Sequence, residues 1–277
     1  MLAAAVAPAA QAAAVITPLR AAVLGAIQGV TEFLPISSSA HLYAVPEMLG
    51  WRYEGVAFDV ALHWGTLLAL LFAFWRDWLD LARGSVKPGA QGATARSTLL
   101  RLAVASVPAA VAGVLLQKEA ETHLRALPLQ ATMLVVFGLL LWLVDRARPG
   151  GRREDVPGWG TSLLVGLAQA VALVPGVSRS GITMTAARGA GMDRVSSARF
   201  SFLLATPITF GAGLLELRHL PHDLPVATLA AGVIASTVVG LLAIHGLLRW
   251  LGRAGFGAFC AYRVVFAGAI VAWLALR

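Results

Sequence analysis

Long uncharged stretches alternate with short polar stretches along the chain. No charged side chain occurs in residues 126–144, 156–178 or 224–248. Each of these runs reaches or approaches the roughly 20 residues that a helix needs to cross a bilayer. Reading the whole chain in this way predicts eight apolar helical segments, over residues 19–49, 56–75, 99–117, 127–145, 158–190, 198–217, 224–248 and 258–276. The pattern predicts an all-α polytopic membrane protein.

Two of the eight segments are interrupted by proline followed by serines. The first interruption reads Phe-Leu-Pro-Ile-Ser-Ser-Ser over residues 33–39, and the second reads Val-Pro-Gly-Val-Ser-Arg-Ser over residues 174–180. Proline inside a helix removes a hydrogen bond and clashes with the preceding turn. A broken segment at membrane depth is tolerated only where it is buried in protein or lines a cavity. We therefore expect two re-entrant helical hairpins.

The two halves of the chain resemble each other. Residues 25–28 are echoed by residues 166–169, and the proline and serine positions follow in step. The motif Val-Val-Phe followed by tryptophan also occurs once in each half. We expect a single membrane domain over residues 1–277 with a first repeat at 19–145 and a second at 156–277. Four features in the same order favour duplication over a chance likeness of apolar helices.

If each broken segment enters and returns, each repeat has one hairpin and three transmembrane helices, which gives six spans in total. Three is odd, so the second repeat is predicted to be inverted. Paired broken helices in inverted halves point to a central binding site.

The formal charge of +8 fits this topology. Basic residues gather in the loops predicted on one face, which are Arg76, Arg83, Lys87, Arg96, Arg146, Arg148, Arg152, Arg153, Arg249 and Arg253, with Arg188, Arg194 and Arg199 after the second hairpin. The positive-inside rule makes that face cytoplasmic. The first hairpin then enters from outside, the second enters from the cytoplasm, and their tips meet in the bilayer. No motif for nucleic-acid binding accompanies the charge, so we expect no nucleic-acid partner.

Two further features of the sequence concern N-terminal processing and disulfide formation. The first 18 residues are uncharged and lack the positive region of a signal peptide, so we expect them to be retained, either loosely ordered or on the membrane surface. Cys260 is the one cysteine, which excludes an intrachain disulfide.

Polar side chains inside the hairpins are the candidates for chemistry, because a charged group at the bilayer centre costs at least about 2.5–3.5 kcal/mol on insertion scales. The first hairpin contains Gln28, Glu32, Ser37, Ser38, Ser39 and His41, and the second contains Ser178, Arg179, Ser180 and Thr183.

The spacing of these residues indicates a phosphate site. Gln28 and Glu32 share a helix face, and Ser38 and His41 can lie together on the helix after the break. A serine after each break can cap a helix N-terminus, which is an anion site. Arg179, lying between two such termini, would bind phosphate oxygens through pairs of hydrogen bonds. The alternatives are that Ser37 and Ser180 only cap helices, that His41 is interfacial, and that Glu32 and Arg179 form a structural pair.

These residues resemble the signatures of the BacA-type undecaprenyl-diphosphate phosphatases. The pattern (E/Q)GxTEFLPxSSxxH matches residues 28–41, and PGxSRSGxT matches residues 175–183. Residues 65–69 and 200–205 also fit, so the resemblance covers nearly the whole chain.

The resemblance implies removal of the terminal phosphate of a C55 polyprenyl diphosphate, which recycles the lipid carrier of peptidoglycan synthesis and confers bacitracin resistance. It implies a site open to the outer (periplasmic) side of the bacterial cytoplasmic membrane and a divalent cation, Mg²⁺ or Ca²⁺. Motif position assigns catalytic roles to Glu32, Ser38, His41 and Arg179. It assigns phosphate contacts to Ser178, Ser180 and Thr183. Ser37 and Ser39 are further candidates for phosphate contacts, and Glu32 is a candidate metal ligand.

The chain departs from the family pattern at two positions. Gln28 stands where one form of the signature has glutamate, and an amide cannot act as a base and is a weaker metal ligand. We assign Gln28 a supporting role. Ala40 stands where glycine is usual.

Our mechanistic hypothesis is that Ser38 or an activated water attacks the terminal phosphorus, that His41 moves the proton, and that Glu32 orients His41 or binds the metal. The rival from another class is a polyprenyl-phosphate flippase, which would need Arg179 but would tolerate loss of Ser38 or His41. A structural subunit without a site is disfavoured by the buried charges. The sequence leaves open a homodimer and the identity of the metal.

Overall fold

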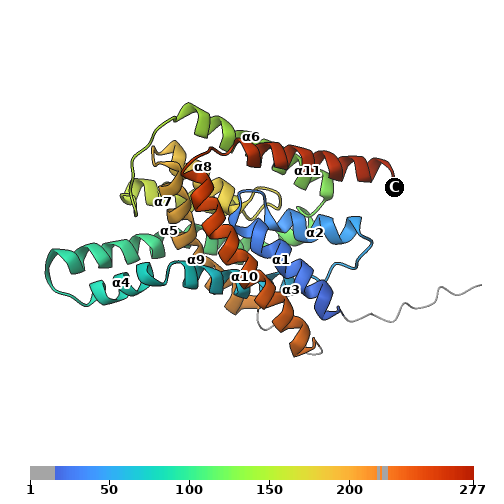
Figure 1. Ribbon diagram of the computed structural model, residues 1–277, viewed down its shortest axis with the longest axis horizontal. Coiled ribbons are helices and arrows are strands. Elements are labelled where there is room, and N and C mark those ends of the chain that lie inside the picture. The colour runs from blue at the N-terminus through green and yellow to red at the C-terminus, as the bar shows by residue number, and fades with distance from the viewer. Residues whose placement is uncertain (1–15, 217–218, 220–223) are drawn as a thin grey trace, which may run out of the picture.

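The computed structural model describes residues 16–216, 219 and 224–277, without the side chains of residues 117 and 121. Nearly all of the N-terminal segment expected to be loosely ordered therefore lies outside the described residues. The described chain forms eleven α-helices (Figure 1), which are α1 Pro18–Phe33, α2 Ser38–Met48, α3 Val56–Ala73, α4 Trp75–Ser85, α5 Gly89–Thr122, α6 Leu127–Ala147, α7 Trp159–Val171, α8 Arg179–Gly189, α9 Arg194–Glu216, α10 Val226–Leu251 and α11 Gly257–Ala275.

Six of these helices, α3, α5, α6, α9, α10 and α11, are long and apolar enough to cross a membrane. The predicted number of six spans is therefore confirmed for the described residues. The two broken segments form the pairs α1–α2 and α7–α8, and their helices have 16, 11, 13 and 11 residues. Each is shorter than the roughly 20 residues that cross a bilayer, as expected of re-entrant hairpins.

One predicted loop is helical. The stretch between the second and third apolar segments forms α4 and the start of α5, which begins ten residues before the predicted segment 99–117. The two helices project together from one end of the bundle (Figure 1). Trp78 and Leu81 of α4 pack against the main hydrophobic core. The pattern of uncharged runs does not predict this amphipathic helix because its outer face is polar.

The first helix of each hairpin packs against a helix from the other half of the chain. Helix α1 lies along α10, and α7 lies along α5. Gly25 of α1 faces the backbone of Gly232, and Gly166 of α7 faces the backbone of Ala105, so that neither glycine has room for a Cβ atom. This packing of each hairpin against the other half of the chain places the hairpins at the centre of the bundle. The inverted relationship of the two repeats stays a prediction.

A buried ion-pair cluster anchors the far end of α8. The Asp145 carboxylate at the end of α6 lies 3.0 Å from Arg188 Nε of α8 and 2.8 Å from Arg194 Nε of α9. It also accepts a hydrogen bond from the Phe256 backbone N–H at 3.3 Å, next to the start of α11. Arg188 is only 1% exposed. It therefore acts as a structural cation that holds α8 in place. The sequence analysis had placed Arg188 among the charges of the predicted cytoplasmic face.

Candidate active site

Both hairpins break at a serine with the same unusual backbone conformation. Ser37 has φ 75° and ψ 96°, and Ser178 has φ 75° and ψ 113°. Such conformations cost a non-glycine residue of the order of 1–3 kcal/mol and gather at functional sites. The hydroxyl of Ser37 lies 3.2 Å from that of Ser39, and the hydroxyl of Ser178 lies 3.3 Å from that of Ser180. The two breaks thus share backbone and side-chain geometry.

Only one of the two serines caps its helix. Ser178 Oγ accepts a hydrogen bond from the Gly181 backbone N–H at 3.2 Å, while Ser37 makes no side-chain cap bond. The N–H groups at the start of α2 therefore have no capping partner from Ser37. Unsatisfied N–H groups at a helix N-terminus favour anions.

The carboxylate of Glu32 lies at the centre of the site and is 6% exposed. Arg179 Nη2 lies 2.8 Å from Glu32 Oε1. Ser38 Oγ donates to Glu32 Oε2 at 2.5 Å, and Gln28 Nε2 donates to the same oxygen at 3.2 Å. The structure thus brings together four residues that the sequence selected, from both hairpins.

Two buried atoms in this cluster have no hydrogen-bond partner in the described chain. They are Arg179 Nη1 and Gln28 Oε1. Buried polar atoms are nearly always paired, so each unpaired one needs an explanation. When one side of a guanidinium pairs with a carboxylate, an N–H that remains free can donate to an anionic ligand.

The tip of the first hairpin (residues 34–37, between α1 and α2) lies against the second hairpin, whose tip is residues 172–178, between α7 and α8. Ser180 Oγ donates to the Leu34 backbone carbonyl at 3.1 Å. Thr183 Oγ1 lies 2.6 Å from Ser201 Oγ of α9 and donates to the Arg179 carbonyl at 2.8 Å. The Thr183 hydroxyl is therefore engaged in holding α8 against α9.

The structure places His41 apart from Glu32. His41 Nδ1 is 2.7 Å from the Ser37 carbonyl, and Nε2 is 2.7 Å from the Tyr262 hydroxyl of α11. The imidazole stacks on Phe266 with 4.0 Å between ring centroids. Because the carbonyl can only accept, Nδ1 carries the proton, and in the neutral imidazole Nε2 accepts a hydrogen bond from the Tyr262 hydroxyl. None of these contacts joins His41 to Ser38.

The histidine beside Glu32 is His63 of α3, which the sequence reasoning missed. His63 Nε2 lies 3.5 Å from Glu32 Oε2, and Nδ1 lies 2.8 Å from the Asp59 carbonyl. The Asp59 carboxylate accepts a hydrogen bond from the Tyr53 hydroxyl at 2.5 Å, and that hydroxyl also contacts Arg125. Burial and the neighbouring Asp59 carboxylate raise the pKa of the Tyr53 phenol. The available signal was two polar residues, Asp59 and His63, on one face of an otherwise apolar segment.

Arg263 of α11 was also missed, and it joins both hairpin tips. Its guanidinium donates to the carbonyls of Pro35 at 3.3 Å, Gly176 at 2.9 Å and Val177 at 3.1 Å. Its side chain is completely buried. Two further bonds go to carbonyls of Leu134 and Met133 in α6. The signal was a single arginine within an apolar run.

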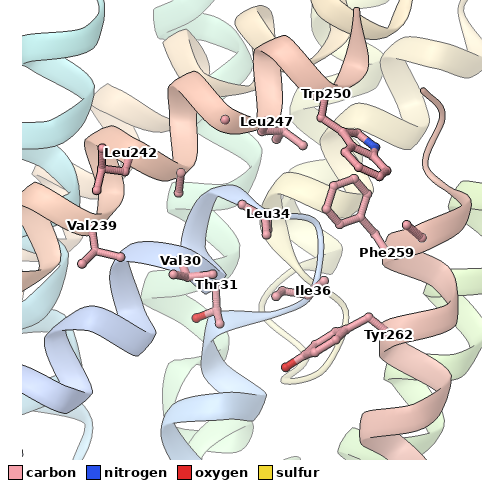
Figure 2. A pocket seen from close by; sticks show the side chains of 13 residues that line it. Val30, Thr31, Leu34, Ile36, Val239, Leu242, Leu247, Trp250, Phe259 and Tyr262 are labelled. Atoms are coloured by element: carbon pink, nitrogen blue, oxygen red, sulfur yellow. The ribbon is translucent and has the colours of Figure 1, made fainter. Parts of the chain in front are cut away.

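A groove of about 710 Å³ lies beside the tip of the first hairpin, between α10 and α11 (Figure 2). Leu34 and Ile36 of the tip form its floor, and Leu247 and Trp250 of α10 face Phe259 and Tyr262 of α11 across it.

The model of the bacitracin resistance protein BacA family matches residues 21–269. This chain belongs to the BacA family. It is 48% identical over 263 residues to the undecaprenyl-diphosphatase of Moorella thermoacetica, covering 94% of this chain and 99% of that protein. It is 45% identical over 262 residues to the undecaprenyl-diphosphatase of Pelotomaculum thermopropionicum, covering 94% and 98% of the two chains.

The donor set beside Glu32 suits a cation shared with a substrate. The described residues contain no group of three or more His, Cys, Asp or Glu that could hold a metal by themselves. The unpaired Gln28 Oε1 and the adjacent Glu32 carboxylate together offer two kinds of oxygen ligand, an amide oxygen and carboxylate oxygens. Mg²⁺ is commonly bound by one or two carboxylates together with substrate phosphates, so these residues fit a cation that binds with the diphosphate.

Proposed function

We propose that this protein hydrolyses undecaprenyl diphosphate to undecaprenyl phosphate and inorganic phosphate, and so recycles the lipid carrier of peptidoglycan synthesis. The relatives named undecaprenyl-diphosphatase support the substrate and the reaction. The observation that carries the proposal is the free, buried Nη1 of Arg179 beside the Glu32–Ser38 pair. That arrangement brings together a hydrogen-bond donor for an anion, a hydroxyl and a base.

The diphosphate binds between the two hairpin tips. The N-termini of α2 and α8 attract its negative charge, and Arg179 donates to a phosphate oxygen. Ser37, Ser39, Ser178 and Ser180 surround these termini with hydroxyl groups. Arg179 remains held by Glu32 while its free N–H contacts phosphate, so the donor is oriented before the substrate arrives.

Ser38 is the nucleophile in this proposal. Its Oγ–H already points at Glu32 Oε2, so the carboxylate takes the proton as Oγ attacks the terminal phosphorus. The bond from that phosphorus to the bridging oxygen breaks, and undecaprenyl phosphate leaves. Water then hydrolyses the phosphoserine and releases inorganic phosphate. His63 next to Glu32 receives or returns the proton, and His41 holds the strained Ser37 carbonyl in place.

A divalent cation, Mg²⁺ or Ca²⁺, would be held by Glu32 and Gln28 Oε1 together with the substrate. When bound, it would neutralise phosphate charge.

The protein is a multi-pass membrane protein, and we propose that it lies in the bacterial cytoplasmic membrane with the site open to the outer side. The support is the basic bias of the loops on one face.

The test is phosphate release from undecaprenyl diphosphate by purified protein in detergent. Ser38→Ala and Arg179→Ala are compared with Arg199→Ala, which removes an arginine that pairs with Asp77 rather than with Glu32. We expect both site variants to lose about 100-fold or more in turnover, as for loss of a charge-stabilising donor, and the control to stay close to wild type.

Two results would overturn the proposal. One is an Arg179→Ala protein with near-normal turnover. The other is a folded wild type that releases no phosphate but moves polyprenyl phosphate across vesicles, with Ser38→Ala equally active, which would identify a flippase.

A further inference from the structure

A polar pocket of about 530 Å³ lies at the loop that follows α6, away from the hairpin site. Six of its seven lining residues are consecutive, 147–152, and the seventh is Gly191, two residues after the end of α8. In Figure 1 this loop lies at the left end of the bundle, the end from which α4 and α5 project. The volume is within the ~300–1,000 Å³ range of sites for small ligands. The pocket shares no lining residue with the groove beside the first hairpin.

Two arginines line the pocket, and their guanidinium groups are only partly paired. The side chain of Arg148 makes no hydrogen bond or ion pair with any residue that the structure describes. Arg152 donates from Nε to Glu154 Oε1 at 2.5 Å and from Nη2 to the Ala190 carbonyl at 3.1 Å, which leaves Nη1 for a ligand. The stretch 146–155 holds four arginines and two carboxylates. The pocket therefore has an excess of positive charge.

Backbone donors also face this loop. The N–H groups of Gly150 and Gly151 have no acceptor among the described residues. A Cβ atom added at Gly150 would meet nothing within 4 Å, so a ligand has room beside it. Guanidinium groups bind phosphate oxygens in pairs, and successive backbone N–H groups form concave anion sites. The donor set matches a phosphate group.

The pocket lies at the depth of the lipid headgroups. Helix α6 is long and apolar enough to span a membrane and ends at Ala147. Trp142 lies five residues earlier, about 7.5 Å along the helix axis at 1.5 Å per residue, and the Arg146 guanidinium lies 5.7 Å from the centroid of its ring. Tryptophan is enriched at the membrane–water interface. The polar layer there is about 5–8 Å thick on each side, so the pocket lies within it.

We propose that this pocket binds the phosphate headgroup of an anionic phospholipid. Basic pockets between transmembrane helices bind such headgroups. A free phosphate ion offers the same oxygens, but a pocket in the headgroup layer is surrounded by lipid phosphates. Leu143 and Leu140, one and two turns before the pocket, are exposed on α6 and offer an apolar wall to the acyl chains. The proposal does not depend on the phosphatase activity.

The pocket is joined to the core through α8. Arg188, in the last turn of α8, donates from Nη1 to the Gly150 carbonyl at 2.8 Å and from Nη2 to the Arg148 carbonyl. The same guanidinium pairs with the buried Asp145. A headgroup that fixes the loop therefore also restrains α8, which carries Arg179 as its first residue. Thermal unfolding of the whole protein should report on its binding.

The first variant removes both cations of the pocket, as Arg148→Gln with Arg152→Gln. Its control is Arg249→Gln with Arg253→Gln, which removes the same charge from two exposed arginines of the same predicted face outside the pocket.

The second variant, Gly150→Glu, adds a carboxylate inside the pocket. Its control, Gly158→Glu, adds the same charge to the same connection but outside the pocket. A Cβ atom meets nothing within 4 Å at either glycine, and neither has a positive φ, so both substitutions fit the backbone.

The experiment measures tryptophan-fluorescence thermal unfolding of delipidated protein in dodecyl maltoside. The protein is titrated with dioleoyl phosphatidylglycerol, with dioleoyl phosphatidylcholine or with inorganic phosphate. For wild type we expect phosphatidylglycerol to raise the unfolding midpoint and the other two to raise it little. Half-saturation of the double-glutamine pocket variant should need about ten-fold more phosphatidylglycerol, equivalent to about 1.4 kcal/mol. Gly150→Glu should show a similar loss, and both controls should match wild type.

A further arm uses Arg179→Ala, which lacks the anion donor of the hairpin site. We expect this protein to keep the response to phosphatidylglycerol, because the lipid binds elsewhere. Loss of the response in Arg179→Ala would place the lipid at the hairpin site and overturn the proposal.

Three other results would also overturn it. One is a wild type whose midpoint does not respond to phosphatidylglycerol. Another is an equal response in the pocket variants and their controls, which would indicate general attraction to a charged micelle. The third is an equal response to inorganic phosphate or to phosphatidylcholine, which would exclude selection of an anionic lipid. If the double-glutamine variant does not fold, Gly150→Glu and Gly158→Glu decide alone.

Discussion

Replacing Arg263 by methionine removes the cation that holds the two hairpin tips together. The guanidinium donates to one carbonyl in the first tip and two in the second, at 2.9–3.3 Å. These carbonyls lie at the breaks, where the chain is not helical, so no helical N–H replaces the arginine. No carboxylate of the described residues pairs with Arg263, so its removal leaves no uncompensated anion.

The magnitude follows from those three carbonyls. Each buried acceptor that loses its donor costs about 1–3 kcal/mol. Methionine preserves the apolar stem and relieves the desolvation of a cation, so we take the lower end, about 3 kcal/mol in all. At about 2–4 °C per kcal/mol for a chain of this size, the midpoint of thermal unfolding should fall by roughly 6–12 °C. Turnover should fall about 100-fold because a displacement of about 1 Å at the tips misplaces the reacting groups.

The assay combines tryptophan-fluorescence unfolding in detergent with phosphate release below the unfolding temperature. Arg263→Lys should be intermediate, because a single ammonium cannot reach both tips as the planar guanidinium does. Arg199→Met serves as control, since Arg199 is about one-third exposed. An Arg263→Met protein that unfolds within about 2 °C of wild type and retains its turnover would refute the reasoning.

Three further predictions concern single contacts of the site. His63→Gln keeps a hydrogen bond to Glu32 but cannot carry a proton, so kcat should fall at least about 100-fold with little change in KM; unchanged kcat in steady-state kinetics would exclude a proton-transfer role. Gln28→Glu places a second carboxylate beside Glu32, so half-saturation by Mg²⁺ or Ca²⁺ should shift to lower concentration in both activity and thermal-shift titrations; identical titrations would contradict the cation site. Ser178→Ala loses the cap bond to Gly181 and should destabilise by about 0.5–2 kcal/mol, whereas Ser178→Gly accepts the positive φ and should unfold at a higher temperature than Ser178→Ala; the reverse order in thermal unfolding would contradict the role of this backbone conformation.

The spans and the two breaks could be predicted because each depends on local sequence. An uncharged run of about 20 residues has few alternatives to a transmembrane helix, and proline followed by serine fixes where a helix must stop. The contact of Gln28 with Glu32 was predictable for the same reason, since residues four apart meet on a helix. Helix α4 was missed because it is amphipathic and half polar.

The partners of the site that come from other helices could not be predicted. His63, Tyr262 and Arg263 lie on α3 and α11, and local periodicity does not say which helices become neighbours of the hairpin tips. Each nevertheless left a trace as a polar residue inside an apolar run. His41 shows that local spacing alone does not establish a shared site. Its spacing of three from Ser38 suggested a shared site, but Ser38 is the first residue of α2 and points back to Glu32, while His41 stacks on Phe266.

The two breaks have one backbone and two chemistries. Counted from the strained serine, Ser38 in the first hairpin occupies the position that Arg179 occupies in the second. Both residues bind the same carboxylate, Glu32, Ser38 through Oε2 and Arg179 through Oε1. A pair of like helix N-termini would only bind an anion, and it is the difference at this one position that places a hydroxyl and a guanidinium beside the same carboxylate. Exchanging the two residues, Ser38→Arg with Arg179→Ser, should therefore preserve affinity for inorganic phosphate while abolishing turnover, because the hydroxyl would then approach from the hairpin that lacks the carboxylate.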